Sequence, residues 1–208
     1  MGLREQKKEQ TRQRIIEVAH RLFGEHGFDG VRVAEVARQA EVAEATLFNY
    51  FPTKEDLFYS GLEAFGDRLI AAVRDRPPGT PALAAFRSVV LGGEGQLERI
   101  AAGDRAALDQ ARTTARVISA SPALRTRERQ ALAAIAADLA GVLGPPGDPV
   151  ARAMANALIG VHGALIEYAR AQVLTAGRPA GIQADVRAHG ERAFALLEDG
   201  LAGYAPAP

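Results

Sequence analysis

Apolar residues recur along most of this chain at intervals of three and four, which is the spacing of one face of an α-helix. In the first such stretch, from Ile15 to Phe23, the apolar residues share a face. Gly27 follows as a helix end, because glycine adopts left-handed backbone angles without steric cost. Alternation of apolar and polar residues never exceeds four positions, so no strand is predicted. The pattern therefore predicts an all-α fold.

Two short helical stretches follow, at residues 33–40 and 44–51, with room for a turn of only three or four residues between them. Pro52 ends the second stretch, because proline disfavours helical geometry in the residue before it. Two short helices joined by such a turn form a helix-turn-helix unit, whose second helix enters the major groove of DNA. The same arrangement is also a common packing motif, and spacing alone leaves both interpretations open.

Beyond this unit the pattern predicts longer helices. Thr53 is an N-cap with Asp56 three residues later, and the helix that it begins runs to about Arg76, where the segment PPGTP interrupts it. Five further helices are predicted, at about residues 81–91, 104–119, 121–143, 149–174 and 183–201. With the first four, this makes about nine helices.

Charge alone points weakly away from nucleic acid. The 25 basic and 25 acidic residues cancel, whereas nucleic-acid-binding domains are often basic. Basic residues do gather near the N-terminus, including Lys7, Lys8 and Arg12. These residues form either a solvated tail or an arm that binds phosphates.

Composition favours a cytoplasmic protein without a membrane segment. Cysteine is absent, which excludes disulfides and thiolate metal sites. The first fourteen residues contain no apolar core of a signal peptide, so none is expected. The most apolar stretch, residues 153–174, is interrupted by polar and charged residues such as His162 and Glu167. It is therefore predicted to be a buried helix and not a membrane span.

The second short helix has two unlike faces on a helical wheel. Leu47, Phe48 and Phe51 cluster on the side expected to face the core. The opposite side consists of Ala45, Thr46, Asn49 and Tyr50, which are uncharged and either small or able to form hydrogen bonds. An ordinary surface helix would carry charged residues there. Such a face suits contact with base edges and phosphates.

Each outward residue has a plausible contact with DNA. Thr46 and Tyr50 can donate to phosphate oxygens. Asn49 can pair bidentately with adenine, and Ala45 can contact a thymine methyl group. Two cations flank the unit and are expected to hold phosphates: Arg32 before the first helix and Lys54 at the start of the next.

The run IIEVAHRLFGEHGFDGVRVAEVARQAEVAEATLFNYFPTKEDLF, residues 15–58, resembles the N-terminal domain of the TetR (tetracycline-repressor-like) family of bacterial transcriptional regulators. The resemblance implies a three-helix DNA-binding domain at residues 9–69, with its helix-turn-helix at about 32–51, and a helical ligand-binding and dimerisation domain at 70–208. It implies a homodimer that binds a palindromic double-stranded operator, usually as a repressor, and releases it when a small-molecule effector binds. It also carries DNA contacts onto Thr46, Asn49, Tyr50 and Lys54.

Four positions depart from the family pattern. Glu41 stands at the turn position that is often glycine, and Glu44 adds a second negative charge at the start of the recognition helix. Phe48 stands where many relatives have tyrosine, so one hydroxyl contact with phosphate is missing. Arg32 replaces the usual N-cap Thr or Ser.

The second domain yields two sets of candidate residues. An effector pocket is expected among the helices from Phe58 to Leu143, with candidate residues Phe65, Leu69, Phe86, Arg87, Val90, Arg116, Ile118 and His162. The long helix after Pro149 carries small residues that allow close helix approach, and the candidate dimer interface comprises Ala153, Ala157, Gly160, Ala164, Tyr168, Phe194, Leu197 and Leu201. Each interface residue could equally be intramolecular core, and a lone histidine on an apolar helix, such as His162, is more often a satisfied core residue than a ligand contact.

No enzymatic motif is found. The four histidines, His20, His26, His162 and His189, lack metal-ligand spacing, and no nucleophile elbow, P-loop or dinucleotide fingerprint occurs. We therefore expect no catalytic activity, cofactor or metal. The main alternative to a DNA-binding regulator is a helical small-molecule-binding dimer that does not bind DNA.

Overall fold

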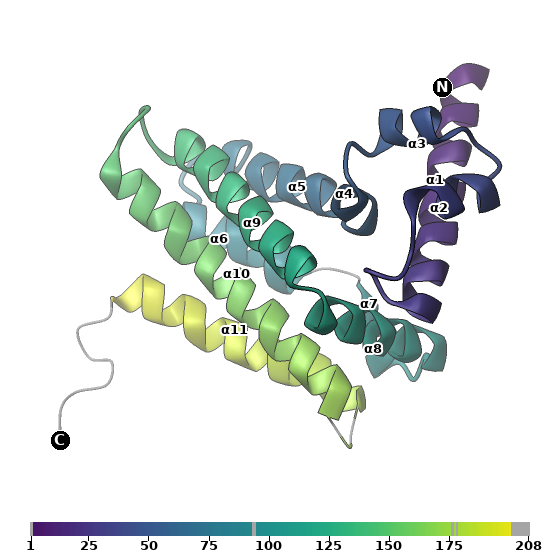
Figure 1. Ribbon diagram of the computed structural model, residues 1–208. Coiled ribbons are helices and arrows are strands. Elements are labelled where there is room, and N and C mark those ends of the chain that lie inside the picture. The colour runs from purple at the N-terminus through teal and green to yellow at the C-terminus, as the bar shows by residue number, and fades with distance from the viewer. Residues whose placement is uncertain (1, 93–94, 176, 178, 201–208) are drawn as a thin grey trace. The chain divides into compact units, whose positions relative to one another are not determined.

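The computed structural model describes residues 2–92, 95–175, 177 and 179–200, and this part of the chain is helical without any strand (Figure 1). The prediction of an all-α fold is confirmed. The elements are α1 (Leu3–His26), α2 (Val33–Gln39), α3 (Glu44–Tyr50), α4 (Lys54–Phe58), α5 (Leu62–Arg74), α6 (Ala82–Leu91), α7 (Gln96–Ala101), α8 (Arg105–Ala120), α9 (Pro122–Leu143), α10 (Pro149–Thr175), the 3₁₀ helix η1 (Pro179–Gly181) and α11 (Ile182–Asp199).

Two differences separate these elements from the nine predicted helices. The helix expected from Thr53 to Arg76 is divided into α4 and α5 by a turn at residues 59–61, where Gly61 weakens helical preference. The short helix α7 follows Gly95 and was not predicted. In addition, α1 continues back to Leu3 through the basic stretch expected to be a tail or an arm.

The chain forms two compact units. The first comprises Met1–Glu63 together with Arg116–Glu128, and the second comprises Ala64–Ala115 together with Arg129–Pro208. The end of α8 and the start of α9 therefore belong to the first unit, although the rest of both helices belongs to the second. The functional division expected at residues 69 and 70 stays a prediction.

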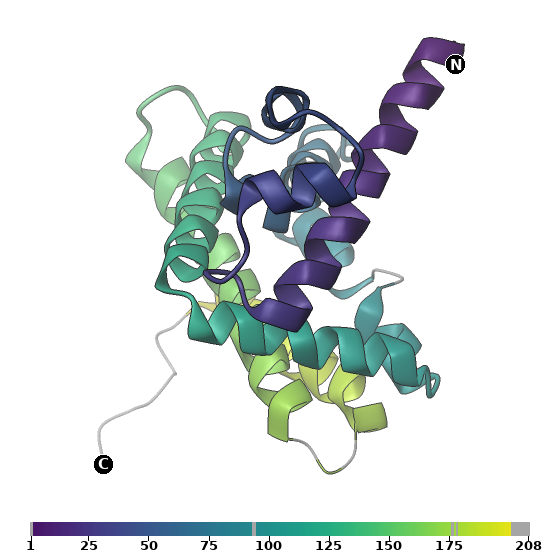
Figure 2. The same cartoon turned by 45° about the vertical axis from the view of Figure 1, so that its right-hand side comes forward.

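Aromatic packing fixes the first unit. The helix α1 packs against α2 and α4, and α2 packs against α3 (Figures 1 and 2). Phe23, Phe28 and Phe58 form a cluster in which ring centroids lie 5.2 to 6.0 Å apart. Ile118 and Leu124, from the segment around the α8–α9 junction, complete this core. These residues share one hydrophobic core with the buried residues of α2 and α3.

The second unit is organised around α10 and α11, which run alongside each other (Figure 1). Phe86 of α6 meets Phe194 of α11 edge to face, with centroids 6.1 Å apart. A Cβ atom at Gly190 would lie only 2.5 Å from a methyl group of Leu91, so α11 approaches α6 closely here and a larger residue would force the Leu91 side chain to move.

The helix α10 is long and apolar enough to cross a membrane by length and composition, with a mean hydropathy of 1.2 over its most apolar window. One third of that window is buried inside the protein. Core helices of soluble proteins meet the same criterion, and α10 packs along α11 over much of its length. The predicted buried helix is thus buried along one side, while residues such as Val150 and Met154 remain exposed.

Candidate DNA-reading helix and effector cavities

The turn between α2 and α3 is unusual in its backbone. Glu41 has φ 55°, and it is the only residue other than glycine with positive φ in the described part of the chain. Left-handed geometry is disfavoured for a residue with a Cβ atom. Arg14 of α1 lies 3.1 Å from the Glu41 carboxylate, which pairs this negative charge at the helix-turn-helix.

The helix α3 presents a mostly uncharged outer face. Leu47 is fully buried and anchors the helix on the core, while Ala45 and Asn49 are exposed. Thr46 and Tyr50 are half-buried. The structure therefore leaves the predicted base-reading residues accessible.

The helical wheel placed Phe48 on the side that faces the core, and this expectation is wrong. The Phe48 side chain is 42% exposed and does not lie in the core. It follows the buried Leu47 by about 100° around the helix, which turns it out of the packed side. Phe48 is therefore a large apolar group on the accessible side of α3, close in sequence to Ala45 and Asn49.

The end of α3 is held by residues of α1. Phe51 is buried, and the Arg12 guanidinium lies 5.4 Å from the centroid of its ring. Arg12 also donates to the Ser60 carbonyl at 2.8 Å, in the turn that separates α4 from α5. The predicted arm residue Arg12 thus has structural contacts, whereas Lys7 and Lys8 lie on the exposed N-terminal turns of α1, which project beyond the neighbouring helices (Figure 2).

Lys54 is held by the core of the first unit. Its ammonium donates to the Phe28 carbonyl and lies 4.3 Å from the centroid of the Phe28 ring. Burial lowers the pKa of Lys54, although Asp29 and Glu55 act in the opposite direction. In this conformation Lys54 supports the loop between α1 and α2. Arg32, by contrast, is exposed at the N-terminus of α2.

The start of α4 is fixed by a reciprocal cap and a salt bridge. The Asp56 amide donates to the Thr53 hydroxyl at 3.1 Å, and the Thr53 amide donates to the Asp56 carboxylate at 3.2 Å. Arg127 of α9 lies 2.7 Å from the same carboxylate. Burial alone would raise the pKa of Asp56, but the hydrogen bonds from Thr53 and Arg127 and the Arg127 charge lower it below its usual value.

A second bond joins the same elements, because the Tyr59 hydroxyl donates to the Leu124 carbonyl at 3.2 Å. The segment that follows the helix-turn-helix of α2 and α3, which we call the reading head, is therefore bonded to the first turns of α9 at two points. Sequence analysis did not identify Arg127 or Leu124 as partners of α4, since no local pattern links positions about 70 residues apart.

The predicted pocket residues are distributed over both units. Phe65 and Val90 line a cavity, whereas Leu69 and Phe86 are fully buried core residues. Arg87 pairs with Glu198 at 3.7 Å. Arg116 and Ile118 belong to the first unit, whereas Phe65 belongs to the second.

His162 is buried in the second unit, with an exposed fraction of 8%. Its ring stacks on Phe65 with centroids 4.8 Å apart. Its Nε2 atom has no hydrogen-bond partner within the described residues. Burial lowers the pKa of His162 to about 4, so the imidazole is neutral at neutral pH.

The predicted dimer residues fall into three groups. Ala153, Gly160 and Ala164 are exposed along α10, and a Cβ atom added at Gly160 would meet open space. Ala157, Tyr168 and Leu197 are half-buried. Phe194 is fully buried and belongs to the core of its own subunit, while Leu201 lies outside the described residues.

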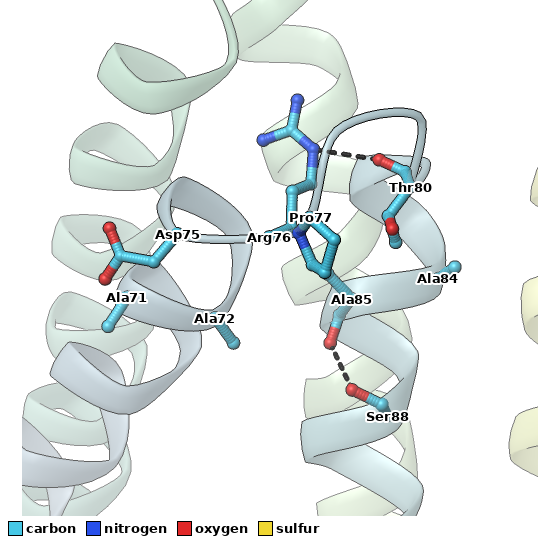
Figure 3. A pocket seen from close by; sticks show the side chains of 9 residues that line it. All are labelled: Ala71, Ala72, Asp75, Arg76, Pro77, Thr80, Ala84, Ala85 and Ser88. Carbon is cyan, nitrogen blue, oxygen red and sulfur yellow. Dashed lines mark hydrogen bonds between the residues drawn. The ribbon is translucent and has the colours of Figure 1, made fainter.

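Two cavities are described in the second unit. The smaller, of about 450 Å³, lies between the end of α5 and α6, and four of its nine lining residues are alanines (Figure 3). Two polar side chains of the lining are hydrogen-bonded: Arg76 donates to the Thr80 carbonyl at 3.0 Å, and the Ser88 hydroxyl donates to the Ala85 carbonyl at 2.7 Å. The larger, of about 640 Å³, is lined by residues of α5, α6, α7 and α11.

No group of three or more metal-ligating side chains occurs within the described residues. The basic residues of the larger cavity, Arg68 and Arg187, were not identified from sequence. They lie more than 100 positions apart on α5 and α11, and only folding brings them to one cavity.

Comparison with known proteins agrees with the helix-turn-helix geometry. Residues 15–60 match the family model described as bacterial regulatory proteins, tetR family. The chain is 33% identical over 93 residues to the HTH-type transcriptional regulator TcmR of Streptomyces glaucescens, which covers 43% of this chain and 41% of that protein. It is 36% identical over 62 residues to the HTH-type transcriptional repressor NicS of Pseudomonas putida, which covers 30% of this chain and 29% of that repressor.

These alignments span less than half the length of the curated relatives. Among solved structures, a transcriptional regulator from Pseudomonas aeruginosa matches the fold with a TM-score of 0.50 and 21% identity, covering 93% of each chain. The sequence motifs, the α2–turn–α3 geometry and the family match coincide on the same residues. The chain thus carries, at residues 15–60, the helix-turn-helix domain of the tetR family of bacterial regulatory proteins.

Proposed function

We propose that the protein is a cytoplasmic, homodimeric, sequence-specific DNA-binding transcriptional regulator, a repressor that leaves a palindromic operator when a small molecule binds. The observation that carries this proposal is the exposed face of α3, which is uncharged at Ala45, Phe48 and Asn49 and stands on a helix-turn-helix of the tetR family. Solvated surface helices ordinarily carry charges on their outer face.

Each residue of that face has a role in the proposed complex. Asn49 pairs with an adenine, and Ala45 and Phe48 contact thymine methyl groups. Thr46 and Tyr50 bind phosphate oxygens and fix the register of α3 in the major groove.

Cations outside α3 supply affinity without sequence preference. Arg32 is exposed at the start of α2, and Lys7 and Lys8 are exposed on α1. Contacts of this kind release counterions from DNA, so binding weakens steeply as the salt concentration rises. Lys54 contributes by holding the loop between α1 and α2 in place.

The dimer is proposed to form through α10 and α11. The exposed small residues Ala153, Gly160 and Ala164 let a second copy of α10 approach closely. Two reading heads related by such a dimer must lie roughly 34–36 Å apart, or a multiple of one DNA turn, to reach successive major grooves on one face.

Release requires that the effector bind the DNA-free arrangement of the heads more tightly than the DNA-bound one. The two ties between α4 and the start of α9, through Arg127 and Leu124, give changes in α9 a route to the reading head. The regulator is proposed to act by this equilibrium and not by catalysis.

The test is selection of bound sequences from random double-stranded DNA, followed by fluorescence anisotropy on the selected site at several salt concentrations. The proposal predicts a palindromic site and a steep salt slope. Asn49→Ala changes the base preference at one position of each half-site, and Gln130→Ala, an amide deletion on an exposed part of α9, leaves it unchanged. A helical ligand-binding dimer without DNA-binding activity would give no complex at any salt concentration.

A further inference from the structure

The larger cavity of the second unit is lined by two chemically distinct kinds of side chain. The apolar ones include Val90, Leu91, Leu97 and Val186, which come from three helices. All four are only half-buried, so they leave apolar surface accessible inside the cavity. A volume of about 640 Å³ lies within the range of small-molecule sites.

Phe65 contributes an aromatic wall with a fixed orientation. Its ring stacks on the buried His162 ring, with centroids 4.8 Å apart. The Arg68 guanidinium lies 5.6 Å from the centroid of the same ring. Phe65 thus contacts both a neutral imidazole and a cation.

The lining of the cavity also includes two cations, Arg68 and Arg187. Arg187 donates from Nη2 to the Leu91 carbonyl at 2.8 Å, which fixes its guanidinium beside the end of α6. An arginine has five N–H donors in a planar fork, so further donors remain for a carboxylate. Within the described residues, neither Arg68 nor Arg187 forms an ion pair with an acidic side chain.

The charge balance decides the ligand class. The described lining contains two arginines and one acid, Glu98, which is exposed. A cationic ligand would meet net positive charge, and a small inorganic anion would leave the apolar lining residues in contact with water. A molecule with an anionic head and an apolar body matches both kinds of lining residue.

We infer that the cavity formed by α5, α6, α7 and α11 binds an amphipathic organic anion, whose carboxylate pairs with Arg187 and Arg68 and whose apolar body lies against Phe65, Val90 and Leu97. This inference rests on the proposed function only for the consequence of binding, which is release of DNA. Occupancy of the cavity is a property of the second unit and is measured without DNA.

Isothermal titration calorimetry on the full chain tests the site with three probes that share a ten-carbon chain: decanoate, decan-1-ol and decyltrimethylammonium, each below its micelle concentration. Decanoate is expected to bind at least about tenfold more tightly than the other two, because a hydrogen-bonded charge pair contributes that much to affinity. Arg187→Gln is expected to weaken decanoate binding by about tenfold, and the double variant Arg68→Gln/Arg187→Gln to abolish the preference for decanoate over decanol.

Arg105→Gln is the matched control, since Arg105 is an exposed arginine of the second unit outside the cavity lining. Thermal unfolding of each variant establishes that it is folded. Equal binding of the three probes, or decanoate affinity unchanged by the double variant, would overturn the inference. DNA binding is assayed separately without decanoate, so a protein that binds decanoate through Arg187 but binds no DNA would refute the proposed function alone.

Discussion

The buried imidazole of His162, whose Nε2 atom has no hydrogen-bond partner among the described residues, gives the sharpest prediction of stability. Its pKa is about 4 in the folded protein, against an ordinary value of 6.5. Between these values the unfolded chain binds the proton and the folded chain does not. The free energy of unfolding therefore falls as the pH falls from 6.5 towards 4, and the loss is complete below both values.

The magnitude follows from the same two pKa values. Their difference of about 2.5 pH units corresponds to a limit of about 3.4 kcal/mol, at about 1.36 kcal/mol for each unit. Between pH 7.5 and pH 5, the linkage relation gives a loss of about 2 kcal/mol from this residue. With a urea dependence of about 2 kcal/mol per molar, the unfolding midpoint should fall by about 1 M over that interval.

The measurement is urea unfolding, followed by circular dichroism, of the wild type and of His162→Leu and His162→Gln at both pH values. Both variants should lose the contribution of His162 to the pH dependence. At pH 7.5 His162→Leu should also be the more stable variant, because it removes a buried polar atom that lacks a partner. Burial also lowers the pKa of His20, so the comparison uses the difference between wild type and variants. If both variants kept the full wild-type pH dependence, the reasoning would be refuted.

Three further predictions concern the first unit. Glu41→Gly should raise the free energy of unfolding, measured by thermal unfolding, by about 0.5 kcal/mol. The reason is that relief of the left-handed backbone outweighs the lost ion pair and the added chain entropy of the unfolded state. Glu41→Ala should give no gain in the same assay. Lys54→Met should lower the free energy of unfolding by about 1 kcal/mol, because the hydrogen bond to the Phe28 carbonyl is lost. Urea unfolding measures this change, and a variant that lost DNA affinity without losing stability would contradict the prediction. Arg127→Gln should lower the free energy of unfolding by about 1 kcal/mol at pH 7. It should also remove the stabilisation that Asp56 provides, which is present above the ordinary carboxyl pKa and is lost as the pH falls through the folded pKa. A double-mutant cycle with Asp56→Asn measures the coupling, and additive effects would contradict the prediction.

Local signals were sufficient for the helices and for the reading unit. The spacing of apolar residues and the stops at Gly27 and Pro52 predicted the boundaries of α1, α2 and α3 to within a few residues, apart from the start of α1. Such signals act over a single helical turn, so they are visible in one sequence. The short α7 was missed because six residues between Gly95 and Ala102 carry too little periodicity.

Contacts between distant positions could not be predicted in the same way. Phe48 was assigned to the core from its apolar character, yet neighbouring Leu47 occupies that position and leaves Phe48 exposed. Lys54 was expected to contact phosphate, which stays a prediction, and its hydrogen bond to the distant Phe28 carbonyl was not foreseen. Arg187 gave no signal, since its site exists only after α11 packs against α6. Each outcome depends on which side chains compete for the same space.

The discontinuous make-up of the first unit limits how such regulators can be recombined. Residues 116–128 close the core beneath the helix-turn-helix, but they are encoded between segments of the other unit. A hybrid that takes residues 1–63 from this protein and everything else from a relative would place foreign side chains beneath Phe58 and opposite Asp56. Exchanging helix-turn-helix domains to redirect an effector response to a new promoter therefore requires that residues 1–63 and 116–128 be exchanged together, which takes three crossovers. Natural shuffling of these domains should leave paired changes in both segments.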